Sequence, residues 1–331
     1  MSVVEPCNNP LVTLAVVTYN QVDYIKEAFE GAISQNYPNL EVIISDDYST
    51  DGTFEVIKEL VAEYEGPHSI VINQNPENKC TLAHFFKVVD LAKGELLLIA
   101  AGDDVSKPER VTETVTVWKE DSSAGIFSNY ELINEKGIVL DDDYCPNSRS
   151  EIAEDVFLKE GGLDIHGASS AYDMAFVKSL PRPEGRFFFE DAYMSFFIYF
   201  FGREISKIDS TLVRYRAHSN SISNNSVASL TSNKIKEKQI KASGYDENKW
   251  KLYMSIKSFS VISDRGGSVM DIDAFERYLF RLQVKSSWIT MPFKKKLDML
   301  LRSYKDDRPL FYWFLPRVFG LDVFSFLRRF G

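Results

Sequence analysis

The stretch of sequence that decides the fold reads Glu95-Leu96-Leu97-Leu98-Ile99-Ala100-Ala101-Gly102-Asp103-Asp104. From Leu96 to Gly102 it carries no charge, which predicts a strand buried on both faces of a parallel sheet. The strand ends in two adjacent carboxylates, which repel each other and need a partner. Ligands bind at the carboxyl ends of strands in open α/β sheets, and hard oxygen ligands select Mg²⁺ or Mn²⁺. The stretch therefore indicates a metal-assisted site, with a simple polar Gly-Asp-Asp turn as the alternative.

Strands and amphipathic helices alternate with short loops on either side of this stretch. Uncharged β-branched runs predict strands, and apolar residues at helical spacing predict helices. The alternation predicts an α/β fold, with a mostly parallel sheet covered by helices on both faces. The expected strands are 12–18, 40–45, 69–73, 96–101 and 125–133. One expected helix begins at residue 21, and the others span 54–64, 81–91, 108–119 and 192–201. A polar surface loop is expected over 141–151.

Composition narrows the class of protein. The chain has 331 residues and 44% apolar content, enough for one large domain or two ordinary ones. A formal net charge of −10 argues against nucleic acid as a partner. Cys7, Cys80 and Cys145 are odd in number and widely spaced, which predicts reduced thiols. The polar start from Ser2 to Asn9 and the lack of a run of roughly 18 apolar residues predict a cytoplasmic protein without signal peptide or membrane span.

Two further polar clusters follow expected strands. Val17-Thr18-Tyr19-Asn20 ends the first strand, and Asp46-Asp47 ends the second. Because parallel strands present their carboxyl ends at one edge of the sheet, these clusters should lie beside Asp103-Asp104. A carboxylate there can accept a hydrogen bond from the imide N–H of uracil, and a metal can neutralise a diphosphate. The three clusters together indicate a nucleotide-diphosphate site.

These residues carry a resemblance to a known family. Thr18-Tyr19-Asn20, the string Asp46-Asp47-Tyr48-Ser49-Thr50-Asp51-Gly52-Thr53 and Gly102-Asp103-Asp104 resemble the nucleotide-binding half of the family 2 glycosyltransferases, over about residues 11–220. That family has a GT-A fold and transfers a sugar from a nucleotide-sugar donor with inversion. The resemblance implies that Asp47, next to Asp46 and the backbone around Val17 to Tyr19, holds the base. It implies that Asp103 faces the donor's sugar or ribose and that Asp104 ligates Mn²⁺ or Mg²⁺.

A candidate base follows three phenylalanines, in the segment Phe188-Phe189-Glu190-Asp191. An apolar setting raises the pKa of a carboxyl group and suits a general base. In the resembling family an acid pair at this place deprotonates the acceptor hydroxyl, a role we assign to Asp191, with Glu190 as the second candidate or an acceptor-binding residue. The alternative is that both acids simply open a helix, where they favour its dipole. The segment His166-Gly167-Ala168-Ser169-Ser170 falls where the family often lines the acceptor pocket.

A softer signal is the segment from Arg214 to Ser223, which begins Arg214-Tyr215-Arg216-Ala217-His218. It resembles a Y-R-x-H segment that follows the catalytic domain in many members of the family. By that resemblance Arg216 reaches the phosphates and His218 reaches the metal or the diphosphate. Histidine is a competent Mn²⁺ ligand. The alternative is a surface histidine in a polar loop.

The same reasoning divides the chain into parts. Residues 1–220 form the expected catalytic domain, with the nucleotide-sugar half over about 11–105 and the acceptor half over about 106–220. A Ser- and Asn-rich linker or lid is expected over 221–234, followed by a helical region over 235–331.

The end of that helical region, residues 291–331, has a composition of its own. It holds nine Lys or Arg against four acids, interleaved with aromatic residues. A basic and aromatic segment suits peripheral contact with an anionic membrane surface, which would place the protein at the inner face of the membrane. The alternative is a helical subdomain that packs on the catalytic domain or on a second copy of the chain in a homo-oligomer.

The expected activity is metal-dependent transfer of one sugar from a nucleotide-sugar, with UDP-sugars favoured, to a hydroxyl of a glycan or lipid-linked acceptor in O-antigen or capsule biosynthesis. The Q-x-x-R-W segment of the family's processive members does not occur, which favours single addition. One alternative is a sugar nucleotidyltransferase, but residues 18–24 lack the glycines and basic side chains of a phosphate loop. The other is a nucleotide-sugar-binding protein without turnover.

Overall fold

The computed structural model describes residues 9–144, 165–217, 244–256, 272–288, 291–296 and 298–299. These residues belong to two compact units: 9–144 with 165–217 form the first, and those from 244 onward form the second. The expected linker at 221–234 lies outside the described residues, as do His218, Cys7, Cys145 and most of the segment 291–331. No helix within the described ranges is long and apolar enough to cross a membrane.

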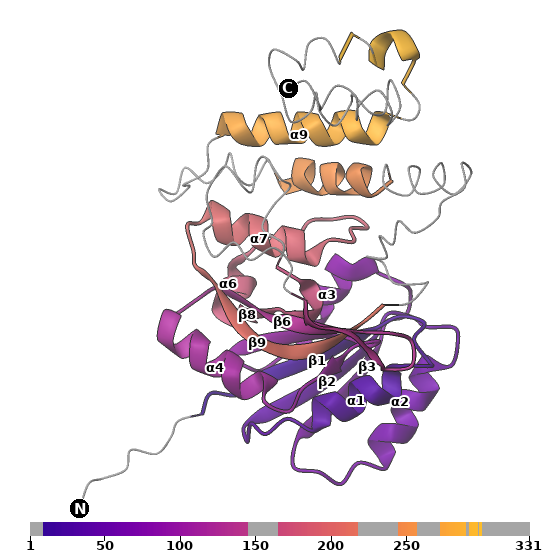
Figure 1. The fold of residues 1–331 in the computed structure, drawn as a ribbon, viewed down its shortest axis with the longest axis vertical. Helices are drawn as coiled ribbons and strands as arrows, with labels where there is room; N and C mark the ends of the chain where they lie inside the picture. The colour runs from indigo at the N-terminus through magenta and orange to yellow at the C-terminus, as the bar shows by residue number, and fades with distance from the viewer. Residues whose placement is uncertain are drawn as a thin grey trace, which may run out of the picture. The chain divides into compact units, whose positions relative to one another are not determined.

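The first unit is built on one mixed sheet (Figure 1), whose strands run in the order β3-β2-β1-β4-β8-β6-β9-β5, with β7 paired to β6. The first four of these strands are parallel, as is the long pair of β6 and β9, so most paired residues belong to parallel pairs. The α/β class predicted from the sequence is therefore confirmed. The strands are β1 (Val12–Thr18), β2 (Leu40–Asp46), β3 (Ser69–Gln74), β4 (Leu96–Ala101), β5 (Val105–Ser106), β6 (Gly125–Ile133), β7 (Val139–Tyr144), β8 (Ala171–Asp173) and β9 (Ile205–Arg216).

Helices cover both faces of this sheet. On one face α1 and α2 lie side by side, and α3 with α6 and α7 covers the other (Figure 1). The helices are α1 (Ile25–Ile33), α2 (Thr53–Ala62), α3 (Cys80–Leu91), α4 (Arg110–Asp121), the short 3₁₀ helix η1 (Gly167–Ser169), α6 (Met174–Ser179) and α7 (Glu190–Phe200). In the second unit residues 244–256 are helical, and α9 spans Ile272–Ser287.

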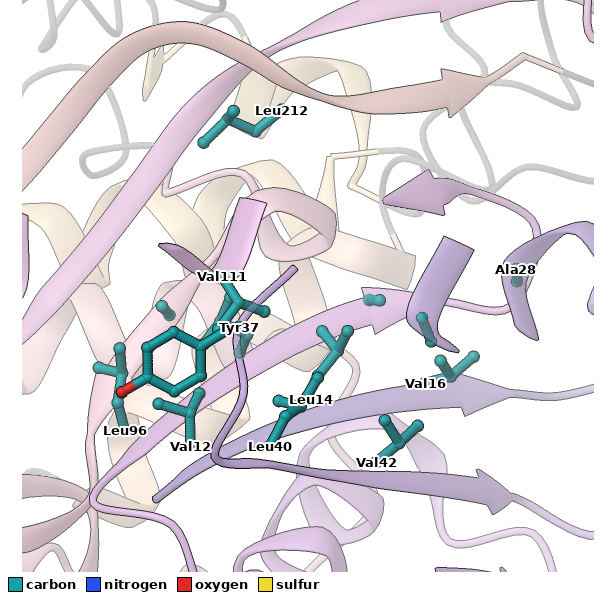
Figure 2. Close-up of a cluster of buried hydrophobic side chains, with 14 of the residues drawn as sticks. Val12, Leu14, Val16, Ala28, Tyr37, Leu40, Val42, Leu96, Val111 and Leu212 are labelled. Atoms are coloured by element: carbon teal, nitrogen blue, oxygen red, sulfur yellow. The ribbon is translucent and has the colours of Figure 1, made fainter. Parts of the chain in front are cut away.

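The apolar runs of the sequence are explained by burial on both faces. Successive side chains of a strand point to opposite faces. Leu14, Val42 and Leu98 belong to a cluster that includes side chains of α1, α2 and α4 (Figure 2). Their strand neighbours Ala15 and Leu97 are fully buried as well. A strand covered on both faces has no solvent-facing side, so β1, β2 and β4 are largely apolar in the sequence. The polar Thr13 and Glu41 within them are buried, and the Thr13 hydroxyl donates a hydrogen bond to the Glu41 carboxylate.

The predicted elements differ from the observed ones mainly at their ends. The helix expected from residue 21 begins only at Ile25, because residues 22–24 form a turn. The surface loop expected over 141–151 is wrong for residues 141–144, which continue β7 and pair with β6. That strand is polar (Asp141-Asp142-Asp143), so its sequence carried no apolar signal for a strand.

Candidate active site

The sheet register brings the three polar clusters to one edge. Thr18 at the end of β1 pairs with Asp46 at the end of β2, and Val17 pairs with Ala101 near the end of β4. Asp47 donates its backbone N–H to the Thr18 carbonyl at 2.9 Å, and Gly102 donates to the Val17 carbonyl at 2.9 Å. The chain segments after these strands therefore start side by side.

Asp47 is held by hydrogen bonds from the loop after β3. Its side chain is 3% exposed, and Oδ1 accepts hydrogen bonds from Asn75 Nδ2 at 2.7 Å and from the Lys79 backbone N–H at 2.8 Å. Within the described part of the chain no hydrogen bond reaches Oδ2. One oxygen is thus held while the other can accept from a ligand N–H. Asn75 and Lys79 carried no sequence signal for this role.

The neighbouring acid, Asp46, has protein partners instead. Its carboxylate accepts from the Ser49 backbone N–H at 2.9 Å, from the Ser49 hydroxyl, and from Gln74 Nε2 at 3.1 Å. Ser49 Oγ in turn accepts from the Asn20 backbone N–H at 2.8 Å, and Asn20 Oδ1 accepts from the Thr50 N–H at 2.9 Å. These bonds close the loop on itself. The expected donor contacts of the Asp46 and Asn20 side chains stay predictions, and this geometry favours a loop-forming role for both.

Two buried oxygens lie beside the end of β4. Thr18 Oγ1 and Gln21 Oε1 are buried and have no hydrogen-bond partner among the described residues. A Cβ atom on Gly102 would lie 2.5 Å from Gln21 Oε1 and 2.7 Å from Thr18 Cβ. Only glycine therefore allows this approach of β4 to β1. The geometry adds Gln21 to the predicted Thr18 as a group that can meet a ligand at this edge.

Asp104 is almost fully buried, with 2% exposure. Its Oδ1 accepts from the Arg216 backbone N–H at 2.7 Å, whereas Oδ2 is buried without a hydrogen-bond partner in the described ranges. Burial and then the charge of Asp103 raise the pKa of Asp104 well above its usual value, against the opposing effect of Arg216 and Arg110. A bound cation would favour the carboxylate, so an orphaned buried oxygen fits a metal ligand.

The protein ligands available here suit a metal ion that takes its other ligands from a substrate and from water. No group of three His, Cys, Asp or Glu that could hold a metal occurs among the residues described. Mg²⁺ is commonly held by one or two carboxylates together with phosphate oxygens and water. Asp104 would be such a carboxylate. His218, the second predicted ligand, lies outside the described residues.

Arg216 contacts the protein rather than an open surface. It is fully buried, and Nε donates to the Asp103 carbonyl at 2.8 Å. One terminal nitrogen donates to the Asn134 and Glu135 carbonyls, and the other to Glu27 Oε2 at 2.7 Å. The expected contact of Arg216 with phosphates stays a prediction. The guanidinium supports the chain around the acid pair.

Glu190 and Asp191 are the first two residues of α7 and lie against η1. A Cβ on Gly167 would come within 2.8 Å of Glu190 Oε1 and 3.9 Å of Asp191 Oδ2. Asp191 Oδ1 accepts from the Ala192 N–H at 2.6 Å, so the helix-opening role weighed for these acids is present. Burial, followed by the charge of Asp191, raises the pKa of Glu190 to about 8. Glu190 therefore keeps its proton at neutral pH beside a second carboxyl group, which is a setting for acid–base chemistry.

Two further residues interact electrostatically with each other: Arg110, which was not singled out from the sequence, and His166, whose segment is expected to line the acceptor pocket. Arg110 donates to the Ile99 carbonyl at 2.6 Å and to Ser106 Oγ at 2.9 Å, and burial lowers its pKa to about 10. His166 packs its ring 4.4 Å from the ring of Tyr130; burial, then Arg110, lowers its pKa to about 4. His166 is therefore neutral at pH 7. Arg110 lies in no motif, so only the folded packing reveals it.

Comparisons with known proteins identify the family of this chain. The sequence model of the family Glycosyl transferase family 2 matches residues 13–180. TuaG of Bacillus subtilis, whose name proposes a glycosyltransferase of teichuronic acid biosynthesis, is 30% identical over 132 residues, which are 40% of this chain and 51% of TuaG. The chain spans about half the length of the curated relatives it matches.

Solved structures share the fold. TarS of S. aureus, residues 1–349 with UDP-GlcNAc, superposes with a TM-score of 0.57 at 16% identity, covering 93% of this chain and 80% of TarS. The mannosyltransferase PcManGT of Pyrobaculum calidifontis, with GDP-Man and Mn²⁺, gives 0.56 at 15% identity, covering 86% and 73%. The GT-A fold is thereby confirmed. Since the family model matches half of its length, this chain belongs to glycosyltransferase family 2.

Proposed function

We propose that this chain transfers one sugar from a nucleotide-sugar donor, with UDP-sugars favoured, to a hydroxyl of a glycan or lipid-linked acceptor. The observation that carries the proposal is the orphaned buried Oδ2 of Asp104, on the same sheet edge as Asp47. Two proteins of the same fold support a donor of this class, since TarS is bound to UDP-GlcNAc and PcManGT to GDP-Man with Mn²⁺.

The donor lies along the edge from Asp47 to Asp104. Asp47 Oδ2 accepts the imide N–H of uracil, and the rings of Tyr19 and Tyr48, each 48% exposed, offer stacking surfaces nearby. Asp103 faces the sugars. Asp104 would hold Mn²⁺ or Mg²⁺, and such a cation would supply Lewis-acid neutralisation of the diphosphate. Thr18 and Gln21 provide further polar contacts at the same edge.

Asp191 acts as the general base. It takes the proton of the acceptor hydroxyl while that oxygen attacks the anomeric carbon from the side opposite the diphosphate. The bond from the anomeric carbon to the diphosphate oxygen breaks with its electron pair, so the nucleoside diphosphate leaves and the configuration inverts. Glu190 holds its own proton near neutral pH, which keeps the pair from carrying two negative charges. A placed base contributes about 10²–10⁴-fold to the rate.

The acceptor belongs to a surface polysaccharide of the O-antigen or capsule kind. This proposal is supported by TuaG, whose name places it in teichuronic acid biosynthesis. A lipid-linked acceptor would suit peripheral contact of residues 291–331 with the inner face of a membrane. Flotation of the full chain with anionic vesicles, against a chain ending at Met291, tests that contact. Equal partitioning of the two chains would remove it.

The proposed function is tested by a donor screen followed by a transfer assay. UDP-, GDP- and dTDP-sugars are added with Mn²⁺, and the melting temperature of the chain is followed. At a ligand concentration of 100 times Kd, the gain of about 2.7 kcal/mol should raise Tm by roughly 5 °C. The donor that stabilises is then assayed for release of its nucleoside diphosphate with candidate acceptors. Binding without release in any acceptor series would favour the nucleotide-sugar-binding protein without turnover, and no stabilisation by any donor would refute the proposal.

A further inference from the structure

The first turn of α1 holds the buried Arg216. Glu27 Oε2 accepts from its guanidinium at 2.7 Å, and the ring of Tyr24 lies 5.0 Å from its Cζ atom. The Arg216 side chain is fully buried, whereas the Glu27 side chain is 50% exposed. Glu27 is therefore an accessible acid whose charge neutralises a buried cation.

Arg216 connects this acid to both aspartates of the site. Its Nε donates to the Asp103 carbonyl at 2.8 Å, and its backbone N–H donates to Asp104 Oδ1 at 2.7 Å. Because Oδ1 is held in this way, Oδ2 is the oxygen that remains for a cation. The position and the charge of Arg216 thus bear directly on the carboxylate that would bind metal.

The helix that carries Glu27 is fixed against the chain just after the acid pair. A Cβ on Gly31 would lie 2.9 Å from the backbone N and O of Ser106, so α1 and β5 are in close contact. Gln35 Nε2 donates to the carbonyls of Gly31 and Lys107, at 2.8 and 2.9 Å. Glu27 therefore projects from a helix that is docked within two residues of Asp104. Groups on rigid elements position a site better than groups on loops.

We infer that Glu27 is a positioning residue, which sets the affinity of the Asp103-Asp104 site for a divalent cation by neutralising Arg216. This inference rests on the proposed metal-dependent function. A cation at Asp104 faces the positive charge of Arg216, and the Glu27 carboxylate offsets that charge. Without Glu27, the positive charge of the buried guanidinium repels the cation without compensation from that carboxylate. The backbone N–H of Arg216, which donates to Asp104 Oδ1, is then less well fixed. Loss of such an outer-shell partner typically weakens metal binding by about 10–100-fold.

The chain provides a matched control for this residue. Glu27 lines a cavity of about 600 Å³ together with Glu30, which lies on the same helix and is exposed. Among the described residues Glu30 has no ion pair or side-chain hydrogen bond. Glu27→Gln and Glu30→Gln therefore remove the same charge from the same cavity wall, but only Glu27→Gln removes it from Arg216. Glutamine keeps an oxygen that can accept from the guanidinium, which limits damage to the fold.

The test measures Mn²⁺ binding rather than turnover. The full chain, with saturating UDP, is titrated with Mn²⁺, and free Mn²⁺ is followed by its electron paramagnetic resonance signal. We expect Glu27→Gln to raise the Kd of Mn²⁺ by about 10-fold, Glu30→Gln to leave it within twofold, and Glu27→Asp to restore part of the loss. In transfer assays the defect of Glu27→Gln should be recovered by excess Mn²⁺, because it lies in metal affinity and not in kcat.

Other results of the Mn²⁺ titration and the transfer assay would contradict the inference. Equal Kd values for wild type and Glu27→Gln, or an equal loss in Glu30→Gln, would overturn the inference while leaving the metal site intact. A fall in kcat at every Mn²⁺ concentration, with an unchanged Kd, would make Glu27 a purely structural residue. Absence of Mn²⁺ binding by the wild-type chain would overturn the proposed metal site and this inference with it.

Discussion

The raised pKa of Glu190 gives a prediction that needs no substrate. In the unfolded chain this carboxyl ionises near pH 4.5, whereas in the folded chain it keeps its proton until the pH passes about 8. Between those values the unfolded state is stabilised by ionisation and the folded state is not, so the wild-type chain loses stability as the pH rises. The full difference corresponds to about 5 kcal/mol. Because Glu190 is only half-buried and solvent screens part of its charge, we expect about 2 kcal/mol.

Glu190→Gln removes the ionisation and keeps the shape of the side chain. We expect this variant to match the wild type at pH 4.5 and to be more stable by about 2 kcal/mol at pH 8.5. Urea unfolding, followed by circular dichroism at both pH values, measures the difference. Glu184→Gln is the control, since Glu184 is an exposed acid in the loop before α7. A stability difference for Glu190→Gln that is the same at both pH values would refute the reasoning.

Three further predictions address the other parts of the site. Asp191→Asn should lower turnover by about 10²–10⁴-fold and leave the Kd for UDP unchanged by calorimetry; full turnover in Asp191→Asn, with loss in Glu190→Gln, would exchange the two roles. Asp104→Asn should make nucleotide binding insensitive to Mn²⁺ and to its removal by EDTA, and an unchanged metal titration would exclude Asp104 as the ligand. Gly102→Ala should cost about 1–3 kcal/mol in urea unfolding, because the new Cβ overlaps Gln21 and Thr18, whereas Gly244→Ala, with nothing within 4 Å, should be close to neutral.

The strands and the shared edge could be predicted because burial leaves a local signature. Strands covered on both faces are mostly apolar, so β1 and β4 begin and end where their uncharged runs do. The alternation of strands and helices then implies the parallel register, which brings Asp47 and Asp104 to one edge. Both features are encoded by residues that are close together in the sequence, and for that reason the sequence alone predicts them.

The partners of the site residues could not be predicted, because they are distant in sequence. Asp47 is oriented by Asn75, 28 residues away, and Arg216 pairs with Glu27, 189 residues away. The adjacent acids Asp46 and Asp47 look equivalent as a pair, yet one closes its own loop and the other faces the ligand edge. The difference arises from the direction of each side chain after β2. No spacing rule encodes it.

The buried charges around Asp104 fit the proposed binding of a cation together with a diphosphate. Arg110 and Arg216 are both fully buried and both act on Asp104 electrostatically. They are opposed by Asp104 itself, by Asp103 and by Glu27, so when all are ionised the group of five carries one net negative charge. A cluster without the arginines would hold a cation strongly but would repel a diphosphate. A cluster without Glu27 would hold the cation less strongly, and Arg216 would lose a charged partner. In the proposed reaction, the near balance would let a cation enter with its diphosphate and would let both depart after transfer.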